Sequence, residues 1–431
     1  PRHWAAPRPC RESFSMVAAL RPPVSLQPRC VDLAIIGAGV GGCALAASLR
    51  REGFGGSIRL LEIGRGPGGR SATRRSRQDP DLLINHGAPC FNLRSSPSPQ
   101  LIAPLAAAGW IRPFEGAIRS LDGNGEIVDP IDDGFSEGAI WQGHGSMDAL
   151  CEGLLAIARG GETTAGEAWC ELQGGTLVRQ LKLRGEGSAL RWSLRDGNGE
   201  LLCEARWLVL SGSLLAHPRA QSVFGWPEVP LQVVAEERGD PQLLAAQRHL
   251  AGMSARASAN LLLSLPAEAA QPWLAQPWRL LQCQEPAQQR WGLRRISIQP
   301  LACDRAAVVA ESSAAFAERH LQVYGSRSSA AQLLGAKPPA EAEAAVLGAL
   351  EQALSEALAA GLNLSTRDSD GQLMRWGAAF PDPPGLPESL RLCPQSALGF
   401  CGDALAGEGF GRIEGALRSA EALATQLKSV L

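Results

Sequence analysis

The sequence lacks the features that mark several large classes of protein. Its 11 cysteines include no CxxC pair and no Cys/His cluster with zinc-ligand spacing, which argues against a disulfide framework and a structural metal site. The net charge is only −2 over 431 residues, so the overall charge does not favour nucleic acid or an anionic membrane. We therefore expect a cytoplasmic location, reduced thiols, no metal, and small-molecule rather than nucleic-acid partners. The oligomeric state stays open.

A continuous apolar run that could span a membrane is also missing. The most apolar stretch, 33–49, contains a glycine turn that would break the helix a span requires. Stable membrane insertion is therefore not expected. Residues 1–29 are rich in proline and arginine and contain no apolar signal-peptide core. We predict that 1–29 lie outside the fold, either as a disordered extension or as an upstream reading of the true start.

A glycine-rich turn near the start of the sequence predicts a nucleotide-binding site. Gly37, Gly39, Gly41 and Gly42 follow an apolar run and precede an alanine-rich segment at 43–49, a pattern typical of strand, tight turn and helix. This geometry lets backbone N–H groups and a helix N-terminus hold a pyrophosphate. NAD and FAD both use such a turn, so the motif alone leaves the cofactor open.

A second set of glycines near the end of the sequence repeats the arrangement. A short apolar strand is expected at 398–401, and Asp403, Gly409 and Gly411 follow it. From Ile413 onward, apolar residues recur at spacings of three and four, which predicts an amphipathic helix. Two such turns, far apart in the chain, predict one dinucleotide held by a domain that the chain leaves and re-enters.

Acidic residues and a third glycine loop favour FAD. Glu62 ends the second predicted strand, about 20 residues beyond the first glycines, where ribose hydroxyls are commonly accepted. In the loop 64–75, Gly69 allows a close backbone approach and Arg70 offers donors to phosphate. Asp403, at the end of a strand, can accept a hydrogen bond from a ribitol hydroxyl. The three loops together favour FAD over NAD.

The pattern of strands and helices predicts an α/β protein with two domains. A Rossmann-like FAD-binding domain is expected to be discontinuous, over 31–77, 146–213 and 388–431. A mixed α+β substrate domain is expected over 78–145 and 214–387.

Several strands are predicted between the glycine turns. The segment 166–210 alternates apolar and polar residues between glycines, which predicts a β-meander. Further strands are predicted around 259–265, 278–283, 293–299 and 307–310.

Five motifs together resemble the FAD-dependent amine-oxidase superfamily, and within it renalase-like proteins. The resemblance runs in order over 31–427, nearly the whole chain. The motifs are GAGVGG at 37–42, GGRSATRR at 68–75, INHGA at 84–88, MRW at 374–376, and FCGD with GFGRIEGALRSAEALA at 400–424.

This resemblance implies a non-covalent FAD and a role for each cofactor loop. It implies that the first glycines and Glu62 hold the adenosine and pyrophosphate, that Arg70 lies nearer the flavin, and that Asp403 meets phosphate and ribitol. The predicted cofactor-binding residues are Gly37, Gly39, Gly41, Gly42, Glu62, Gly69, Arg70, Asp403, Gly409, Gly411, Arg412 and Ile413. Renalase-like enzymes oxidise misreduced dihydronicotinamide dinucleotides by hydride transfer to the flavin and pass the electrons to oxygen. A reduced nicotinamide dinucleotide is therefore one implied substrate.

Other functions stay open on the same scaffold. One is an amine, porphyrinogen or carotenoid-type flavin oxidoreductase, and another is a flavin-binding protein without turnover. Many relatives that oxidise amines use a lysine near the flavin and a cage of tyrosines. Here Lys182, Lys337 and Lys428 are the only lysines and Tyr324 is the only tyrosine, so a typical amine-oxidase site is hard to assemble.

No catalytic acid or base can be named from the sequence. His86 and Trp376 are weak candidates: a hydrogen-bonded structural histidine and a packed core tryptophan are the simpler interpretations. The superfamily more often has aspartate where this chain has Asn85, so a role that needs a charge there is doubtful. Arg294 and Arg295, on a predicted strand of the substrate domain, could meet substrate phosphates or lie on an exposed face.

Overall fold

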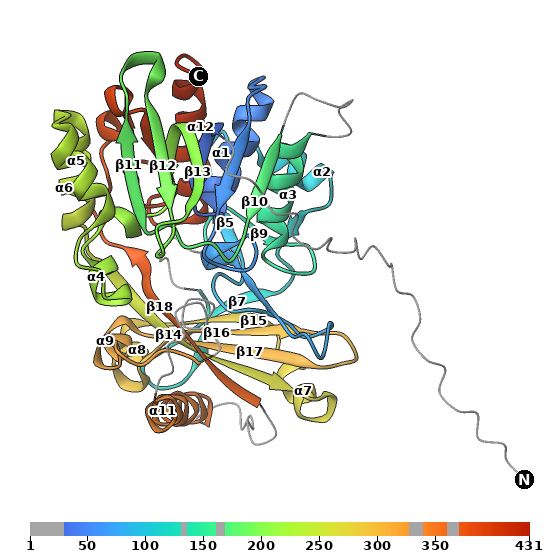
Figure 1. Cartoon of the computed structure of the whole chain (residues 1–431). Coiled ribbons are helices and arrows are strands. Elements are labelled where there is room, and N and C mark those ends of the chain that lie inside the picture. The colour runs from blue at the N-terminus through green and yellow to red at the C-terminus, as the bar shows by residue number, and fades with distance from the viewer. Residues whose placement is uncertain (1–29, 131–135, 161–168, 327–338, 360–369) are drawn as a thin grey trace, which may run out of the picture.

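The computed structural model describes residues 30–130, 136–160, 169–326, 339–359 and 370–431 (Figure 1). The predicted extension 1–29 lies outside these residues. Two large sheets dominate the fold and lie one above the other in Figure 1. In the described part of the chain, no helix combines the length and the apolar character that crossing a membrane requires.

The first sheet has eight strands and a parallel centre. Strand β1 pairs in parallel with β2 on one side and with β13 on the other, and β13 continues in parallel to β20. The order is β10-β2-β1-β13-β12-β11, with β20 beside β13 and β19 beside β20. The strands are β1 Cys30–Ile36, β2 Ile58–Leu61, β10 Cys170–Gln173, β11 Gln180–Arg184, β12 Arg191–Arg195, β13 Leu201–Leu210, β19 Leu392–Cys393 and β20 Leu398–Phe400.

Helices cover both faces of this sheet because successive strand residues point to opposite faces. On one face Leu33 and Ile35 of β1 pack in a core with helices α1 Val40–Arg51, α3 Ala149–Arg159 and α12 Ile413–Leu427. On the other face Ala34 packs in a core with α5 Pro230–Arg238 and α6 Pro241–Gly252. The short helix α4 Arg219–Phe224 precedes α5.

The predicted meander is only partly present. Strands β11, β12 and β13 are antiparallel neighbours, as the alternation predicts. Strand β10, however, pairs in parallel with β2 at the opposite edge of the sheet. Residues 161–168 lie outside the described residues. The alternation of apolar and polar residues therefore indicated the strands correctly, but it could not show which strands pair with each other.

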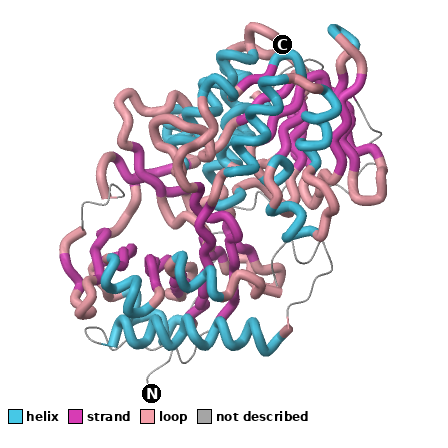
Figure 2. The backbone as a smooth tube through the Cα atoms, turned by 90° about the vertical axis from the view of Figure 1, so that its left-hand side faces the viewer, coloured by secondary structure: helices cyan, strands magenta, loops and turns pink. Residues whose placement is uncertain are grey.

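The second sheet has seven strands in the order β18-β14-β17-β16-β15-β7-β8, and all pairs except β15·β7 are antiparallel. Helix α11 Ala340–Ala359 lies across one face of this sheet, as Figure 2 shows, and shares a core with its apolar side chains. The strands are β7 Ala117–Leu121, β8 Ile127–Val128, β14 Ala255–Leu265, β15 Trp278–Cys283, β16 Leu293–Pro300, β17 Ala306–Ser312 and β18 Asp370–Pro381. The other helices beside it are α7 Ala267–Leu274, α8 Glu285–Trp291 and α9 Ala314–Arg319.

Two small sheets join the large ones. One pairs β3 Thr73–Arg75 with β4 Leu83–Asn85, and the other is β5-β9-β6. The strands of the latter are β5 Phe91–Leu93, β6 Ile111–Pro113 and β9 Ala139–Gly143, and α2 Ile102–Ala107 lies between β5 and β6 in the chain.

The domain limits drawn from the sequence stay a prediction, and the packing favours a change to them. Residues of α5 and α6, assigned above to the substrate domain, are buried against the first sheet. Phe91, Leu93 and Ile111 of the small sheet likewise share a core with α1 and α12. We would therefore assign α5, α6 and the small sheet β5-β9-β6 to the first domain. The second domain then consists of the second sheet and its helices.

Candidate functional site

The two predicted glycine turns contact each other. A Cβ atom added at Gly41, on the first turn of α1, would lie 2.8 Å from Cα of Gly402, which follows β20. Gly402 has a φ of +116°, and a Cβ there would lie 2.8 Å from the carbonyl oxygen of Ser211. Glycine is required at both positions because any side chain would strike backbone. The start of α1 and the segment that follows β20 are thus brought together.

The remaining glycines of the first turn fix the strand-to-helix bend. Gly37 has a φ of +101°, and a Cβ at Gly42 would lie 2.1 Å from the carbonyl oxygen of Gly37. The hydroxyl of Ser211, just after β13, donates to the carbonyl oxygen of Gly37 at 2.9 Å. Gly39 caps α1 without any side-chain hydrogen bond. The N-terminus of α1 is therefore presented by backbone alone, as a pyrophosphate site needs.

Glu62 holds the backbone around the first turn. One carboxylate oxygen accepts from the backbone N–H of Ala38 at 2.7 Å, and the other accepts from that of Gly64, also at 2.7 Å. The residue is buried, with 9% of its surface exposed. A carboxylate fixed in this way lies at the end of β2, the position from which ribose hydroxyls are bound in Rossmann-like folds.

The third glycine loop connects the two turns. The backbone N–H of Gly68 donates to the carbonyl oxygen of Ala38 at 2.8 Å, which ties the loop to the first turn. At Arg70 the guanidinium donates through Nη1 to Asp403 Oδ2 at 2.7 Å and to the carbonyl oxygen of Ala379 at 2.9 Å. Arg70 Nη2 also pairs with Asp403. Arg70 and Asp403, predicted to act separately on the cofactor, are thus paired with each other.

The start of α12 completes this part of the site. Gly411 has a φ of +73°, and Arg412 caps the helix without a side-chain hydrogen bond to its backbone. The Arg412 side chain instead donates to Glu414, whose carboxylate is fully buried and also accepts from the Ser95 hydroxyl. A Cβ at Gly409 would lie 2.5 Å from the backbone nitrogen of Gly415. Glu414 therefore fixes the loop around the helix N-terminus.

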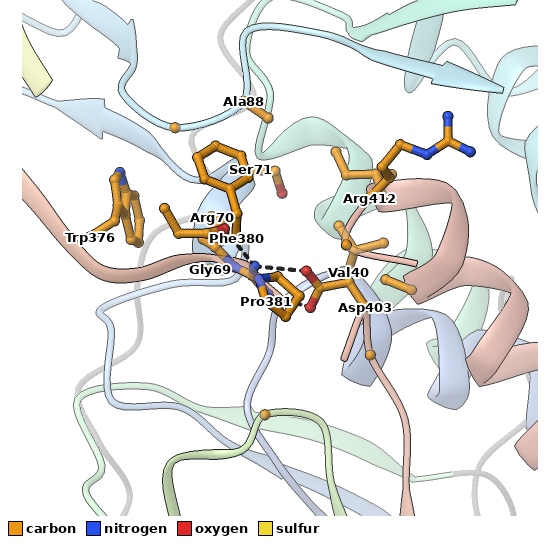
Figure 3. A pocket seen from close by; sticks show the side chains of 18 of the residues that line it. Val40, Gly69, Arg70, Ser71, Ala88, Trp376, Phe380, Pro381, Asp403 and Arg412 are labelled. Carbon is orange, nitrogen blue, oxygen red and sulfur yellow. Dashed lines mark hydrogen bonds and ion pairs between the residues drawn. The ribbon is translucent and has the colours of Figure 1, made fainter. Parts of the chain in front are cut away.

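A cavity of about 650 Å³ runs past these residues and is lined from both large sheets. All the predicted cofactor residues line it except Gly42 and Gly409, which serve backbone packing. Figure 3 shows Arg70 and Asp403 paired near its centre, with Trp376 and Phe380 on one side and Arg412 on the other. A second cavity of about 1740 Å³ shares Glu62, Arg70, Trp376 and Asp403 with the first. The roles of these residues toward a cofactor stay predictions.

His86 and Trp376 form a structural unit beside the cavity. Their rings are stacked with centroids 5.4 Å apart, and Trp376 Nε1 donates to the carbonyl oxygen of His86 at 3.3 Å. Burial, with a smaller effect of the nearby Arg74 charge, lowers the pKa of His86 to about 3. The imidazole is therefore neutral near pH 7 and is too weak a base to hold a proton there. Asn260 also donates to the carbonyl oxygen of His86, at 2.8 Å.

The departure at Asn85 has a structural explanation. The side-chain oxygen of Asn85 accepts from the Thr73 hydroxyl at 2.7 Å and from the backbone N–H of Met147 at 2.9 Å. A neutral amide satisfies both donors, so no charge is needed. A Cβ at Gly87 would lie 1.9 Å from the carbonyl oxygen of Arg70, which explains why a glycine follows His86 in this segment.

Two neighbouring arginines of the second sheet line the first cavity, and the side chain of one of them, Arg294, is also 35% exposed. Arg294 and Arg295 of β16 both pair with Glu311 of β17, whose side chain is 5% exposed. Among the described residues, no lysine lines either cavity, and Tyr324 lines only the second. Burial raises the pKa of the cavity-lining Cys90 thiol to about 12, so it is protonated and unreactive near pH 7.

Sequence reasoning missed many residues that line the first cavity. Four that bear on its chemistry are Ser211, Arg256, Glu311 and Phe380. Only Glu311 carried a usable signal, as a carboxylate that ends the otherwise apolar strand 306–311. The others depend on pairing between strands that are distant in sequence. In the described residues no group of His, Cys, Asp or Glu is placed to hold a metal, and no two of the described cysteines form a disulfide.

Comparison with known proteins supports the fold. A family profile described as an NAD(P)-binding Rossmann-like domain matches residues 35–106. Among curated proteins, no sequence matches at a significant level. The fold-class prediction, α/β with a Rossmann-like domain, is confirmed.

Three solved structures have a similar fold over nearly the whole chain. A candidate protoporphyrinogen oxidase from Exiguobacterium sp. 255-15 is 12% identical, with a TM-score of 0.59 over 93% of this chain and 99% of that one. A putrescine oxidase with a redesigned cofactor site is 13% identical, with a TM-score of 0.55 over 94% and 100%. Cyclohexylamine oxidase from Brevibacterium oxydans IH-35A is 15% identical, with a TM-score of 0.55 over 92% and 99%. At these identities the likeness establishes the fold alone.

Proposed function

We propose that this protein binds one FAD non-covalently and is an FAD-dependent oxidoreductase. The observation that carries the proposal is that the N-termini of α1 and α12 line one cavity, beside the close approach of Gly41 to Gly402. Neither α1 nor α12 has a side-chain cap at its N-terminus. Two such termini suit the pyrophosphate of a dinucleotide. The similar folds of the oxidases named above support the same assignment.

The residues present fit FAD along the length of the cavity. Glu62 stands where it would accept from the ribose of the adenosine half, and backbone N–H groups near Val40 and Asp403 would meet the pyrophosphate. Asp403, held by Arg70, would meet the ribitol. Trp376 and Phe380 would border the ring system. When bound, FAD supplies a hydride acceptor, and the protein orients the donor and shapes the surroundings.

We further propose hydride transfer from a reduced small-molecule donor, with oxygen as the electron acceptor. The resemblance to renalase-like proteins favours a dihydronicotinamide dinucleotide as that donor. The neutral His86 and the absence of a lysine among the described lining residues support a reaction that needs no strong base at the site. The predicted cytoplasmic location is compatible with such a donor and stays a prediction.

The test begins with the purified protein, which should show flavin absorbance that denaturation releases. The protein is then mixed anaerobically with dihydronicotinamide isomers, primary amines, a porphyrinogen and a carotenoid. We expect rapid bleaching only with a dihydronicotinamide, and peroxide formation when oxygen is admitted. No flavin absorbance after purification and reconstitution would overturn the cofactor assignment.

The same screen separates the alternatives. Rapid bleaching by an amine, porphyrinogen or carotenoid would replace the renalase-type donor with that substrate class. Stoichiometric FAD that no donor in the screen reduces would favour a flavin-binding protein without turnover.

A further inference from the structure

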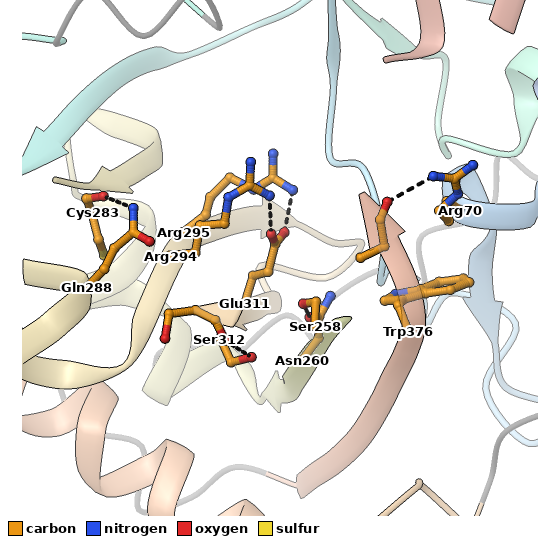
Figure 4. A network of polar contacts seen from close by, with 12 residues as sticks. Arg70, Ser258, Asn260, Cys283, Gln288, Arg294, Arg295, Glu311, Ser312 and Trp376 are labelled. Carbon is orange, nitrogen blue, oxygen red and sulfur yellow. Dashed lines mark hydrogen bonds and ion pairs between the residues drawn. The ribbon is translucent and has the colours of Figure 1, made fainter. Parts of the chain in front are cut away.

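The second sheet brings positive charge to one wall of the proposed active site. Six arginines but only three carboxylates line the first cavity. They are Arg70, Arg94, Arg256, Arg294, Arg295 and Arg412, against Glu62, Glu311 and Asp403. Three of the arginines come from strands β14 and β16, and Figure 4 shows the guanidinium groups of two of them, Arg294 and Arg295, directed at Glu311.

Two irregularities in strand pairing create this arrangement. Neighbouring residues on a regular strand point to opposite faces, yet Arg294 and Arg295 both reach Glu311. The register between β16 and β17 shifts between Leu293 and Arg295, which turns the two consecutive side chains toward one carboxylate. A second shift, between Arg256 and Ser258 of β14, lies beside the same cavity. Bulges are common next to active sites because they redirect side chains.

The arginines of this cluster are held by a carboxylate and an aromatic ring. Arg294 Nη1 donates to Glu311 at 2.8 Å, and Arg295 Nη2 donates to the other carboxylate oxygen. The guanidinium carbon of Arg294 lies 3.8 Å from the centroid of the Phe380 ring, and that of Arg256 lies 5.7 Å from the same centroid. A guanidinium fixed by a carboxylate on one side and a ring on another loses little entropy when it binds a ligand.

The charge of the cluster is only partly balanced. Glu311 supplies one negative charge to two arginines, and Asp382 pairs with Arg256 at 3.0 Å. The guanidinium of Arg294 carries five N–H donors, and Glu311 accepts from only one of its nitrogens, Nη1. Burial first, and then the neighbouring charges of Arg295 and Arg256, lower the pKa of Arg294 against the opposing effect of Glu311. An added anion would relieve this crowding of like charges.

We propose that Arg294 and Arg295, positioned by Glu311, bind a carboxylate or phosphate group of the substrate, so that the enzyme accepts an anionic donor and disfavours a cationic amine. The proposal rests on the proposed function for the reaction but assigns the substrate's charge from this cluster alone. A putrescine-like dication would place positive charge beside arginines in a partly desolvated site.

The test measures binding to the FAD-loaded protein by calorimetry, with inorganic phosphate, succinate and putrescine as probes. We expect phosphate, succinate or both to bind, and putrescine not to bind. Succinate alone would identify a carboxylate, and phosphate alone a phosphate group. Arg294→Gln should weaken anion binding at least about ten-fold. The matched control is Arg290→Gln, which removes the same charge from an exposed residue of α8 outside the cavity and should leave the affinity unchanged.

Several results would overturn the proposal. These are failure of both anions to bind the wild type, equal losses in the two glutamine variants, and binding of putrescine at this site. If Arg294→Gln does not fold, Arg294→Lys decides: it keeps the charge but loses the planar fork, so the affinity should fall about three-fold or more. Wild-type affinity in that variant would contradict the assignment.

Calorimetry measures binding without any flavin reduction. The experiment can therefore contradict the anion site without contradicting the proposed reaction, and the reverse. Anion binding that depends on Arg294, in a protein that no donor reduces, would contradict the proposed reaction and leave the anion site standing. Rapid reduction of the flavin by a donor whose KM is unchanged in Arg294→Gln would support the proposed reaction and contradict the anion site.

Discussion

The two ends of the cavity differ in whether backbone or side chains form their surface. At the cofactor end, glycine backbone and helix N-termini form the surface, and the contact of Gly41 with Gly402 leaves no room for side chains. At the other end, long side chains from strands form the surface, with Arg294 and Arg295 around Glu311. If the proposed assignments hold, the comparison teaches that the pyrophosphate is bound mainly by backbone, with a few carboxylates beside it, whereas the substrate is selected by side chains that can change without disturbing that backbone.

The largest effect should come from a side chain placed between the two turns. Gly41→Ala would put a Cβ atom 2.8 Å from Cα of Gly402, and such overpacking against backbone costs about 1–3 kcal/mol. We expect a lower midpoint of urea unfolding and an affinity for FAD reduced about ten-fold or more. The control is Gly55→Ala, since that exposed glycine has nothing within 4 Å of an added Cβ. If Gly41→Ala and Gly55→Ala have the same unfolding midpoint and the same affinity for FAD, the close approach of Gly41 to Gly402 does not shape the cofactor end.

A smaller effect should follow from loss of the carboxylates at the cofactor end. Asp403→Ala removes the partner of Arg70, whose side chain is 42% exposed, so the cost to stability should be only about 1 kcal/mol. We expect FAD retention to fall about three- to ten-fold, and Glu62→Ala to weaken it similarly. Equilibrium dialysis of FAD measures both. Glu115→Ala, which breaks an exposed pair with Arg112, is the control. Unchanged retention in both test variants would show the ribose and ribitol assignments to be wrong.

The smallest effect is expected from His86, which belongs to neither end. Its pKa of about 3 keeps it neutral from pH 5 to 8, so His86→Gln should leave the pH profile of flavin reduction unchanged in that range. Stability should behave differently. The unfolded histidine takes up a proton near pH 6.5 and the folded one does not until about pH 3, so wild-type stability should fall as the pH drops below about 6.5. Urea unfolding at pH 7.5 and 5.0 should show a smaller fall in the variant. If the rate of flavin reduction instead changes with pH around 6.5, and His86→Gln abolishes that change, His86 takes part in catalysis.

The cofactor end was predictable because its geometry depends on residues that are close together in the sequence. The spacing of Gly37, Gly39 and Gly42 before an alanine-rich helix determines one backbone geometry, and β1 and α1 lie where that spacing predicts. The strand before Gly402 and the helix from Ile413 were found in the same way. What the spacing could not give was the pairing of Arg70 with Asp403, since each was interpreted only against the cofactor.

The substrate end was not predictable because it depends on register. The sequence shows Arg294 and Arg295 side by side, and regular alternation would place only one of them toward the cavity. The shift at Leu293 that turns both inward is a property of pairing with β17. The partner of β10 and the packing of α5 and α6 on the first sheet were missed for the same reason: each depends on contacts between distant segments.

The contact between Gly41 and Gly402 also bears on how this protein is made. A ribosome has released almost the whole described chain before Gly402 can reach α1, and closing so long a loop costs conformational entropy that local contacts do not repay. The proposed pyrophosphate site therefore forms only after Gly402 has been synthesised, later than the local structure of β1 and α1. Until then the N-terminus of α1 lacks this neighbour, so we expect FAD to bind only once the second turn has been made.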